Sequence, residues 1–260
     1  THARFIPSTV YDNAAIDSGY RRKLERLTGW QREAWLEGDW DIAAGQFFST
    51  WKHEIHVVEP FHIPPHWTMW ASMDYGYMHP TVVYLGTEFD GTVYVVGEHA
   101  ESRSLPQTHA TDIKMMLARH GRTLDDLSCF TAGADVFAQK GDREAKTIAE
   151  QYAEYGINLA PAPMDRINGW SEILRLLGDE QKGIPHTVEV FSDCYRLIDC
   201  MPSLIHNPKR VEDVLKVNVN EDGVGGDDPG DAFRYLVMTR LLEEEELPFA
   251  GGERAQLLRA

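Results

Sequence analysis

Residues 67–76 have the sequence Trp67-Thr68-Met69-Trp70-Ala71-Ser72-Met73-Asp74-Tyr75-Gly76. The first seven form an apolar run of strand length, and the run stops at a carboxylate followed by a glycine. This pattern predicts a buried strand with Asp74 at its carboxyl end. The strand decides the fold because the segments that follow it alternate between strand and helix patterns in a particular order.

Two runs of β-branched and aromatic residues come next, Thr81–Gly86 and Thr92–His99, and Phe89-Asp90-Gly91 between them predicts a hairpin. The later patterns predict a helix at Pro106–Arg119, a strand at Leu127–Ala134, a helix at Asp142–Tyr155, a strand at Ile157–Ala160, and helices at Trp170–Leu177, Tyr195–Ser203 and Ala232–Leu242. Three consecutive antiparallel strands followed by strand–helix–strand units indicate an α/β fold. We therefore expect a mixed β-sheet, in which antiparallel hairpin strands join parallel strands, flanked by helices.

The first sixty residues have a different character. Helices are predicted at Tyr20–Leu27, capped by Asp17 or Ser18, and at Gln31–Leu36, but the remainder has aromatic residues and little regular pattern. The prolines between Glu59 and Pro65 break both helices and sheet ladders. The sequence thus divides into a linker or arm, residues 1–60, and a main domain, residues 61–260.

Composition bounds the function classes. The chain of 260 residues has 25 Lys and Arg against 41 Asp and Glu, a net charge of −16, and its hydrophobic fraction of 43% can supply a core. No apolar run approaches the roughly 18 residues that span a bilayer, so a membrane protein is not expected. Cys129, Cys194 and Cys200 form no CxxC pair, which predicts small buried side chains and fits a reducing compartment.

The acidity argues against nucleic acid as a partner, because phosphates repel negative charge. However, the charge is unevenly distributed. The last 40 residues hold 10 acids and 4 bases, and residues 221–231 hold five acids and no base. Such clustering needs a local reason, and cation binding is one.

Three aspartates occupy equivalent places in the predicted fold. Asp74 and Asp135 each follow a strand pattern, and Asp231 opens the last helix. Ligands of α/β sheets gather at the carboxyl ends of strands. Converging carboxylates repel one another, and a hard divalent cation, Mg²⁺ or Mn²⁺ rather than zinc, relieves that repulsion. Two such ions, roughly 3.5–4 Å apart, activate water and stabilise the leaving oxygen of a phosphodiester.

A structural interpretation stands beside this one. An aspartate after a strand is often a helix N-cap or a turn residue. Asp227 and Asp228 could simply complement the dipole of the last helix. Phosphate-cradling P-loop, G-x-S-x-G and dinucleotide-binding G-x-G-x-x-G motifs are all absent from the sequence.

The aspartates belong to three longer stretches, which are Asp74-Tyr75-Gly76, Phe130-Thr131-Ala132-Gly133-Ala134-Asp135, and Asp227-Asp228-Pro229-Gly230-Asp231-Ala232-Phe233-Arg234-Tyr235. In order and spacing they resemble motifs of the C-terminal nuclease domain of tailed-bacteriophage terminase large subunits, the motor proteins of DNA packaging. Flanking segments are similar to the family's linker between motor and nuclease and to the segment before its closing motif; they are Tyr11-Asp12-Asn13, Leu36-Glu37-Gly38-Asp39-Trp40, Gly45-Gln46-Phe47-Phe48 and Val190–Leu204.

The resemblance implies an RNase H-like nuclease over residues 61–260, which cleaves double-stranded DNA with metal ions during viral genome packaging. By correspondence Asp74, Asp135 and Asp231 are the catalytic metal ligands, Asp228 assists them, and Mg²⁺ or Mn²⁺, as two ions, is the cofactor. The family's ATPase motor is missing, so Thr1 would lie in the middle of a longer protein.

The resemblance also implies partners and a location. They are double-stranded DNA, the small terminase subunit, the portal and the procapsid, without a membrane, in the cytoplasm of an infected bacterium. Lys140, Arg143 and Lys146 follow Asp135 and are predicted to contact phosphate, although a solvated helix face has the same pattern. We expect weak intrinsic affinity for DNA, with the grip supplied by the motor and other partners.

Two other classes of function remain open at this point. Another RNase H-like nuclease, of the resolvase or transposase type, would use the same carboxylates. A non-catalytic packaging-assembly module would use them only as structural residues.

Overall fold

A seven-stranded sheet forms the centre of the computed structural model, which describes residues 9–12, 16–36, 45–139, 145–220 and 225–242. Its order is β1-β7-β4-β3-β2-β5-β6. The bounds are β1 Val57–Val58, β2 Met69–Asp74, β3 Thr81–Phe89, β4 Thr92–Glu101, β5 Leu127–Ala132, β6 Ala160–Pro161 and β7 Val188–Phe191. Within this sheet β3 alone runs opposite to the others. The predicted mixed sheet is therefore confirmed.

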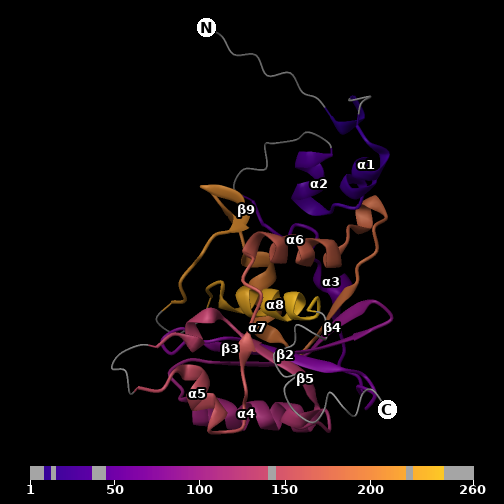
Figure 1. Cartoon of the computed structure of the whole chain (residues 1–260). Helices are drawn as coiled ribbons and strands as arrows, with labels where there is room; N and C mark the ends of the chain where they lie inside the picture. Colours follow the sequence, from indigo (N-terminus) through magenta and orange to yellow (C-terminus); the bar gives the residue numbers. More distant parts are fainter. Residues whose placement is uncertain (1–8, 13–15, 37–44, 140–144, 221–224, 243–260) are drawn as a thin grey trace.

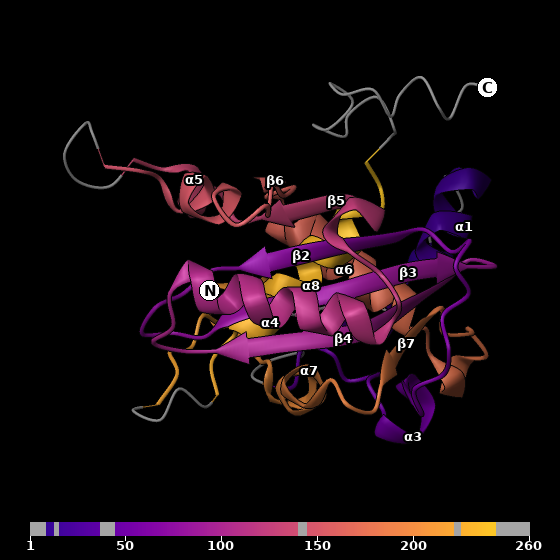
Figure 2. The same ribbon diagram turned by 90° about the horizontal axis from the view of Figure 1, so that it is seen from below.

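Helices cover both faces of the sheet (Figures 1 and 2). On one face lie α4 (Pro106–Arg119) and α5 (Ile148–Ala153), which pack against each other. On the other face lie α7 (Tyr195–Cys200) and α8 (Asp228–Thr239), with α6 (Arg166–Leu177) packed outside α8. Figure 2, seen from below, shows α4 in front of the strands and α8 behind them. The sheet thus separates two helical layers.

Helix α8 lies against the middle of the sheet and positions its own first turn. The indole Nε1 of Trp70 donates to the carbonyl of Leu236 at 2.9 Å, and the hydroxyl of Ser72 donates to the carbonyl of Ala232 at 2.7 Å. Side chains alternate along a strand, so Asp74 points to the same face as Ser72 and Trp70. The end of β2 and the start of α8 therefore meet.

Part of the first sixty residues packs onto this core. The chain forms α1 (Ser18–Glu25), capped by Asp17 as predicted, then α2 (Gly29–Trp35) and α3 (His53–His56). Phe47 and Phe48 are fully buried, with ring centroids 6.4 and 6.0 Å from that of Trp170 in α6. Strand β1 pairs with β7. The division at residue 60 stays a prediction.

Short elements complete the chain. They are the 3-10 helices Val10–Asp12, Leu124–Asp126, Ala134–Phe137, Glu180–Lys182 and Met201–Ser203, and a hairpin of β8 (His206–Asn207) and β9 (Arg210–Val214). All three cysteines are buried and free. No helix among the described residues is both long enough and apolar enough to cross a membrane.

Several element bounds differ from the predicted ones. Strand β5 ends at Ala132, and Asp135 lies beyond it in the 3-10 helix. Helix α8 begins at Asp228, four residues before the predicted start, because Pro229 fits the first turn of a helix. Asp228 and Asp231 therefore share one helical turn.

Candidate functional site

Four aspartates gather at the carboxyl edge of the sheet. Asp74 is the last residue of β2, and Asp135 follows the neighbouring parallel strand β5. Asp228 and Asp231 come from the first turn of α8. Asp135 is exposed, and its Oδ1 lies against Gly133 beside the hydroxyl of Tyr235. The three segments predicted to meet are therefore together.

The charges of these aspartates act on one another. Burial raises the pKa of Asp74 well above its usual value, and the negative charges of Asp231, Asp228 and Asp135 raise it further. Burial also raises the pKa of Asp227 and Asp228, with a further contribution from Asp231 in each case. The Oδ2 atom of Asp227 is buried without a hydrogen-bond partner. The site therefore has more negative charge than its own cations neutralise.

Asp231 is engaged by two arginines. Arg166 Nη1 donates to both of its carboxylate oxygens at 2.8 Å, and Arg234 donates to Oδ1 from Nε and Nη2 at 3.2 and 3.0 Å. Arg166 is itself held by Asp213, at 3.0 Å. The more distant Lys216 ammonium is 3.8 Å from Asp231 Oδ2. Asp231 thus obtains its counter-charge from arginine.

The four carboxylates do not meet at a single point. Within the part of the chain that the structure describes, no three of the four aspartates bring their oxygens within 4.8 Å of one another. Mutual repulsion keeps bare carboxylates apart. The donor set nevertheless fits a hard divalent cation, because it is all oxygen, partly buried and short of positive charge.

His79 is a residue of the site that the sequence analysis missed. Its Nδ1 lies 3.3 and 3.2 Å from the two oxygens of Asp228. The loop that presents it closes tightly, since the hydroxyl of Thr81 donates to the carbonyl of Gly76 at 2.7 Å. A Cβ at Gly76 would lie 2.5 Å from the carbonyl oxygen of His79, so a side chain is excluded there.

Arg166 and Lys216 were missed as well. Both come from segments without a motif of their own and reach the site only through the tertiary packing of α6 and the chain after β9. The Gly76 of Asp74-Tyr75-Gly76 was the one sequence signal that a tight loop, and hence a residue such as His79, lay beside the carboxylates.

Of the three residues predicted to contact phosphate, the structure describes one. Lys140 and Arg143 lie outside the described residues. Lys146 is exposed and forms an ion pair with Glu154. Its contact with phosphate stays a prediction.

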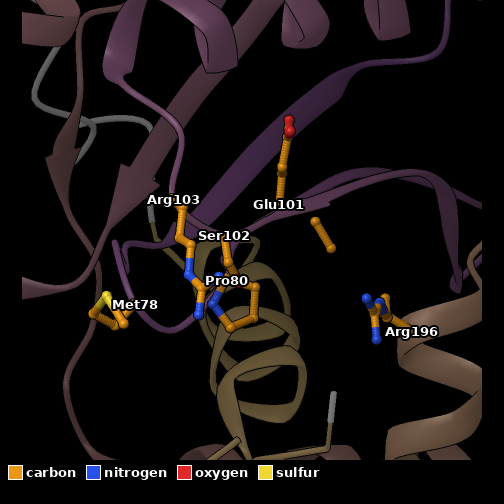
Figure 3. Close-up of a pocket in the computed structure, with 7 residues that line it drawn as sticks. Met78, Pro80, Glu101, Ser102, Arg103 and Arg196 are labelled. Atoms are coloured by element: carbon orange, nitrogen blue, oxygen red, sulfur yellow. The ribbon is translucent and has the colours of Figure 1, made fainter. Parts of the chain in front are cut away.

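A basic pocket of about 270 Å³ adjoins the His79 loop (Figure 3). Its lining consists of Met78, Pro80, Ala100, Glu101, Ser102, Arg103 and Arg196. Arg103 has φ 59°, a left-handed conformation that side chains rarely adopt, and its amide donates to the carbonyl of Tyr77 at 2.6 Å. Strained backbone of this kind occurs at functional sites. Arg103 and Arg196 therefore line a pocket next to the loop that carries His79.

Comparison with known proteins adds the fold relationship. No family model and no curated protein matches the sequence. The large terminase of a thermophilic bacteriophage, in complex with ADP, matches with a TM-score of 0.67 and 19% identity over 90% of this chain and 55% of that chain. The P22 large terminase nuclease domain matches with a TM-score of 0.58 and 18% identity, over 76% of this chain and 93% of that one.

The chain thus has an α/β fold with a mixed sheet, of the class found in nuclease domains. Among these, the fold of the chain matches that of phage large terminase nuclease domains. The chain spans about half, 55%, of the length of the thermophilic phage's large terminase.

Proposed function

We propose that the chain is a metal-dependent endonuclease that cleaves double-stranded DNA during viral genome packaging, as the nuclease part of a terminase large subunit. The observation that carries the proposal is the grouping of Asp74, Asp135, Asp228 and Asp231 at the carboxyl edge of this sheet, where their charges act on one another. That edge is where α/β folds bind ligands. The fold shared with the large terminase of the thermophilic phage and with the P22 nuclease domain supports the same assignment.

The four aspartates would hold Mg²⁺ or Mn²⁺, as two ions. The cations would supply Lewis-acid chemistry, which activates water and stabilises the leaving oxygen of a phosphodiester. Arg166 and Arg234 donate hydrogen bonds to Asp231 and fix the orientation of its carboxylate. His79 orients Asp228 in the same way. These contacts hold two of the four carboxylates in fixed orientations.

The proposed substrate and partners follow from the packaging role. Double-stranded DNA would approach along the edge lined by Arg103 and Arg196, with Lys140, Arg143 and Lys146 as further phosphate contacts. The small terminase subunit, the portal and the procapsid are the proposed protein partners. The proposed location is the cytoplasm of an infected bacterium.

Cleavage of supercoiled plasmid tests the proposal. Nicked and linear products are expected with Mn²⁺ or Mg²⁺ and none with EDTA. Asp74→Asn and Asp231→Asn should abolish cleavage. Asp90→Asn is the matched control, because Asp90 is exposed at the β3–β4 hairpin, at the opposite end of the strands. Circular dichroism of each variant confirms that it is folded.

Other outcomes would contradict the proposal. Full activity in both Asp74→Asn and Asp231→Asn would remove these residues from the site. A preference for Holliday junctions would indicate a resolvase-type enzyme instead. Absence of any Mn²⁺ site in calorimetry would indicate a non-catalytic assembly module.

A further inference from the structure

A second cluster of metal-ligating side chains lies on the other face of the sheet. His99 and Glu101 are near the end of β4, and His109 is in the first half of α4. One nitrogen from each histidine and one carboxylate oxygen of Glu101 all lie within 4.8 Å of one another. This is the one such group of three among the residues that the structure describes.

The register of the sheet separates this cluster from the aspartates. His99 pairs with Val83, whereas Asp74 pairs with Val82. Because neighbouring residues of a strand point to opposite faces, His99 and Glu101 face α4, and Asp74 faces α8. The sheet therefore lies between the two groups.

The two imidazoles already converge. His99 Nε2 lies 2.8 Å from His109 Nδ1, and the rings meet edge to face with centroids 5.1 Å apart. His109 is fully buried, and its ring stacks on Tyr152 of α5 at 6.5 Å. Packing thus fixes the orientation of one ligand before any cation is bound.

Glu101 completes the group from the solvent side. It is exposed, and Figure 3 shows its carboxylate directed away from the neighbouring Arg103 and Arg196, although all three line the basic pocket. Its negative charge acts on both imidazoles, where it opposes the lowering of the pKa of His99 and His109 by burial. The exposed carboxylate leaves this side of the group open to solvent.

We propose that His99, Glu101 and His109 bind a zinc-class transition-metal cation that is distinct from the cations of the aspartate centre. Two imidazoles and one carboxylate, with water as the fourth ligand, are a common tetrahedral set for Zn²⁺. Imidazole nitrogen selects zinc and its neighbours, whereas oxygen-only sites select Mg²⁺ or Mn²⁺. Tetrahedral angles at Zn–N distances of about 2.0–2.1 Å need the two nitrogens roughly 3.3 Å apart, a small opening of the present contact.

Bound metal would link β4 to α4. Glu101 directly precedes Ser102 and Arg103, which line the basic pocket. The cation would therefore stabilise the chain segment that places Arg103. This site does not depend on the proposed nuclease function.

Zinc titration of the full chain tests the proposal in an Asp74→Asn/Asp231→Asn background, which disables the aspartate centre. One Zn²⁺ per chain is expected by competition with a chromophoric chelator. Glu101→Gln and His99→Gln should each weaken binding at least about tenfold, because each removes one of three ligands. Zinc should raise the Tm of the parent chain but not that of these variants. Glu59→Gln and His66→Gln are the controls, because both positions are exposed and outside the cluster.

Cobalt gives an independent readout. Co²⁺ bound by imidazoles in a tetrahedral site should show visible absorption, and Glu101→Gln should change it. Zinc affinity that is equal in the parent and in both cluster variants would overturn the proposal. So would the absence of a saturable zinc site in the parent chain. Because cleavage is not measured, failure here is distinguishable from failure of the nuclease assignment.

Discussion

The ionised carboxylate of Asp74 lowers the free energy of unfolding of the cation-free chain, because other negative charges lie close to it. Its pKa is raised by burial and by the surrounding Asp231, Asp228 and Asp135. Between the ordinary value and the raised value, the folded chain binds more protons than the unfolded chain. The free energy of unfolding therefore falls as pH rises through this window, and the penalty is complete above it. A bound cation would relieve this penalty.

Asp74→Asn should accordingly stabilise the chain in EDTA. We expect a gain in the free energy of unfolding on the order of 1 kcal/mol at pH 8, since an amide cannot ionise. The gain should shrink toward acidic pH, where Asp74 itself is protonated. Urea unfolding of the variant and the parent between pH 4 and 8 measures the gain at pH 8 and its decrease toward acidic pH. A variant that is less stable than the parent at pH 8 would contradict this account.

Gly169 is the residue that makes room for Arg234. A Cβ at Gly169 would lie 2.5 Å from Arg234 Cγ, and Arg234 is only 1% exposed. Alanine normally favours a helix over glycine by about 1 kcal/mol. Here overpacking should dominate, so Gly169→Ala should destabilise by about 1–3 kcal/mol in urea unfolding. Gly45→Ala, where a Cβ meets nothing within 4 Å, should be close to neutral. Equal stability of the two variants would show that Arg234 is not tightly packed.

At the scale of elements, the contact between β2 and α8 sets the site. The Ser72 hydroxyl is fully buried and donates to Ala232 in α8. Ser72→Ala should cost about 1 kcal/mol, the typical value of one internal hydrogen bond. The matched control is Ser128→Ala, because Ser128 is exposed and makes a similar bond to Met69 at 3.1 Å. Thermal unfolding of both variants tests this, and a larger loss in Ser128→Ala would contradict it.

The length of an element decides whether its sequence pattern predicts it. Strands β2, β3 and β4 and helix α4 were found because their patterns are long and their turns are specific. Strand β7 has four residues and β1 has two, which is too short for a periodic signal. The sequence predicts that Asp74, Asp135 and Asp231 lie together because each adjoins the end or the start of a predicted element. The sequence does not predict His79 and Arg166 as site residues, because long-range packing rather than a local pattern places them there.

At the scale of the whole molecule, the sheet divides two kinds of ligand chemistry. The α8 face holds the aspartates beside arginines, and the α4 face holds the paired imidazoles. The two groups need no shared residue, so each can be altered without the other. This separation is what allows the two metal assignments to be tested independently.

The net charge of −16 bears directly on the affinity of the chain for DNA. Excess negative charge opposes the approach of phosphate to the chain. We therefore expect the chain alone to bind a duplex weakly, with a Kd no tighter than about 10⁻⁶ M at physiological salt, and to lose affinity steeply as salt rises. Fluorescence anisotropy in EDTA, from about 50 to 200 mM salt, measures both quantities.

Arg196 should contribute to that affinity because it lines the basic pocket beside the site. Replacing one phosphate contact lowers the slope of log affinity against log salt by about 1. Arg196→Ala should show this loss, whereas Arg119→Ala, exposed at the far end of α4, should not. Tight binding that is insensitive to salt would mean that the acidic surface does not oppose DNA. In that case this chain itself, rather than a motor or other partners, would supply the affinity for DNA.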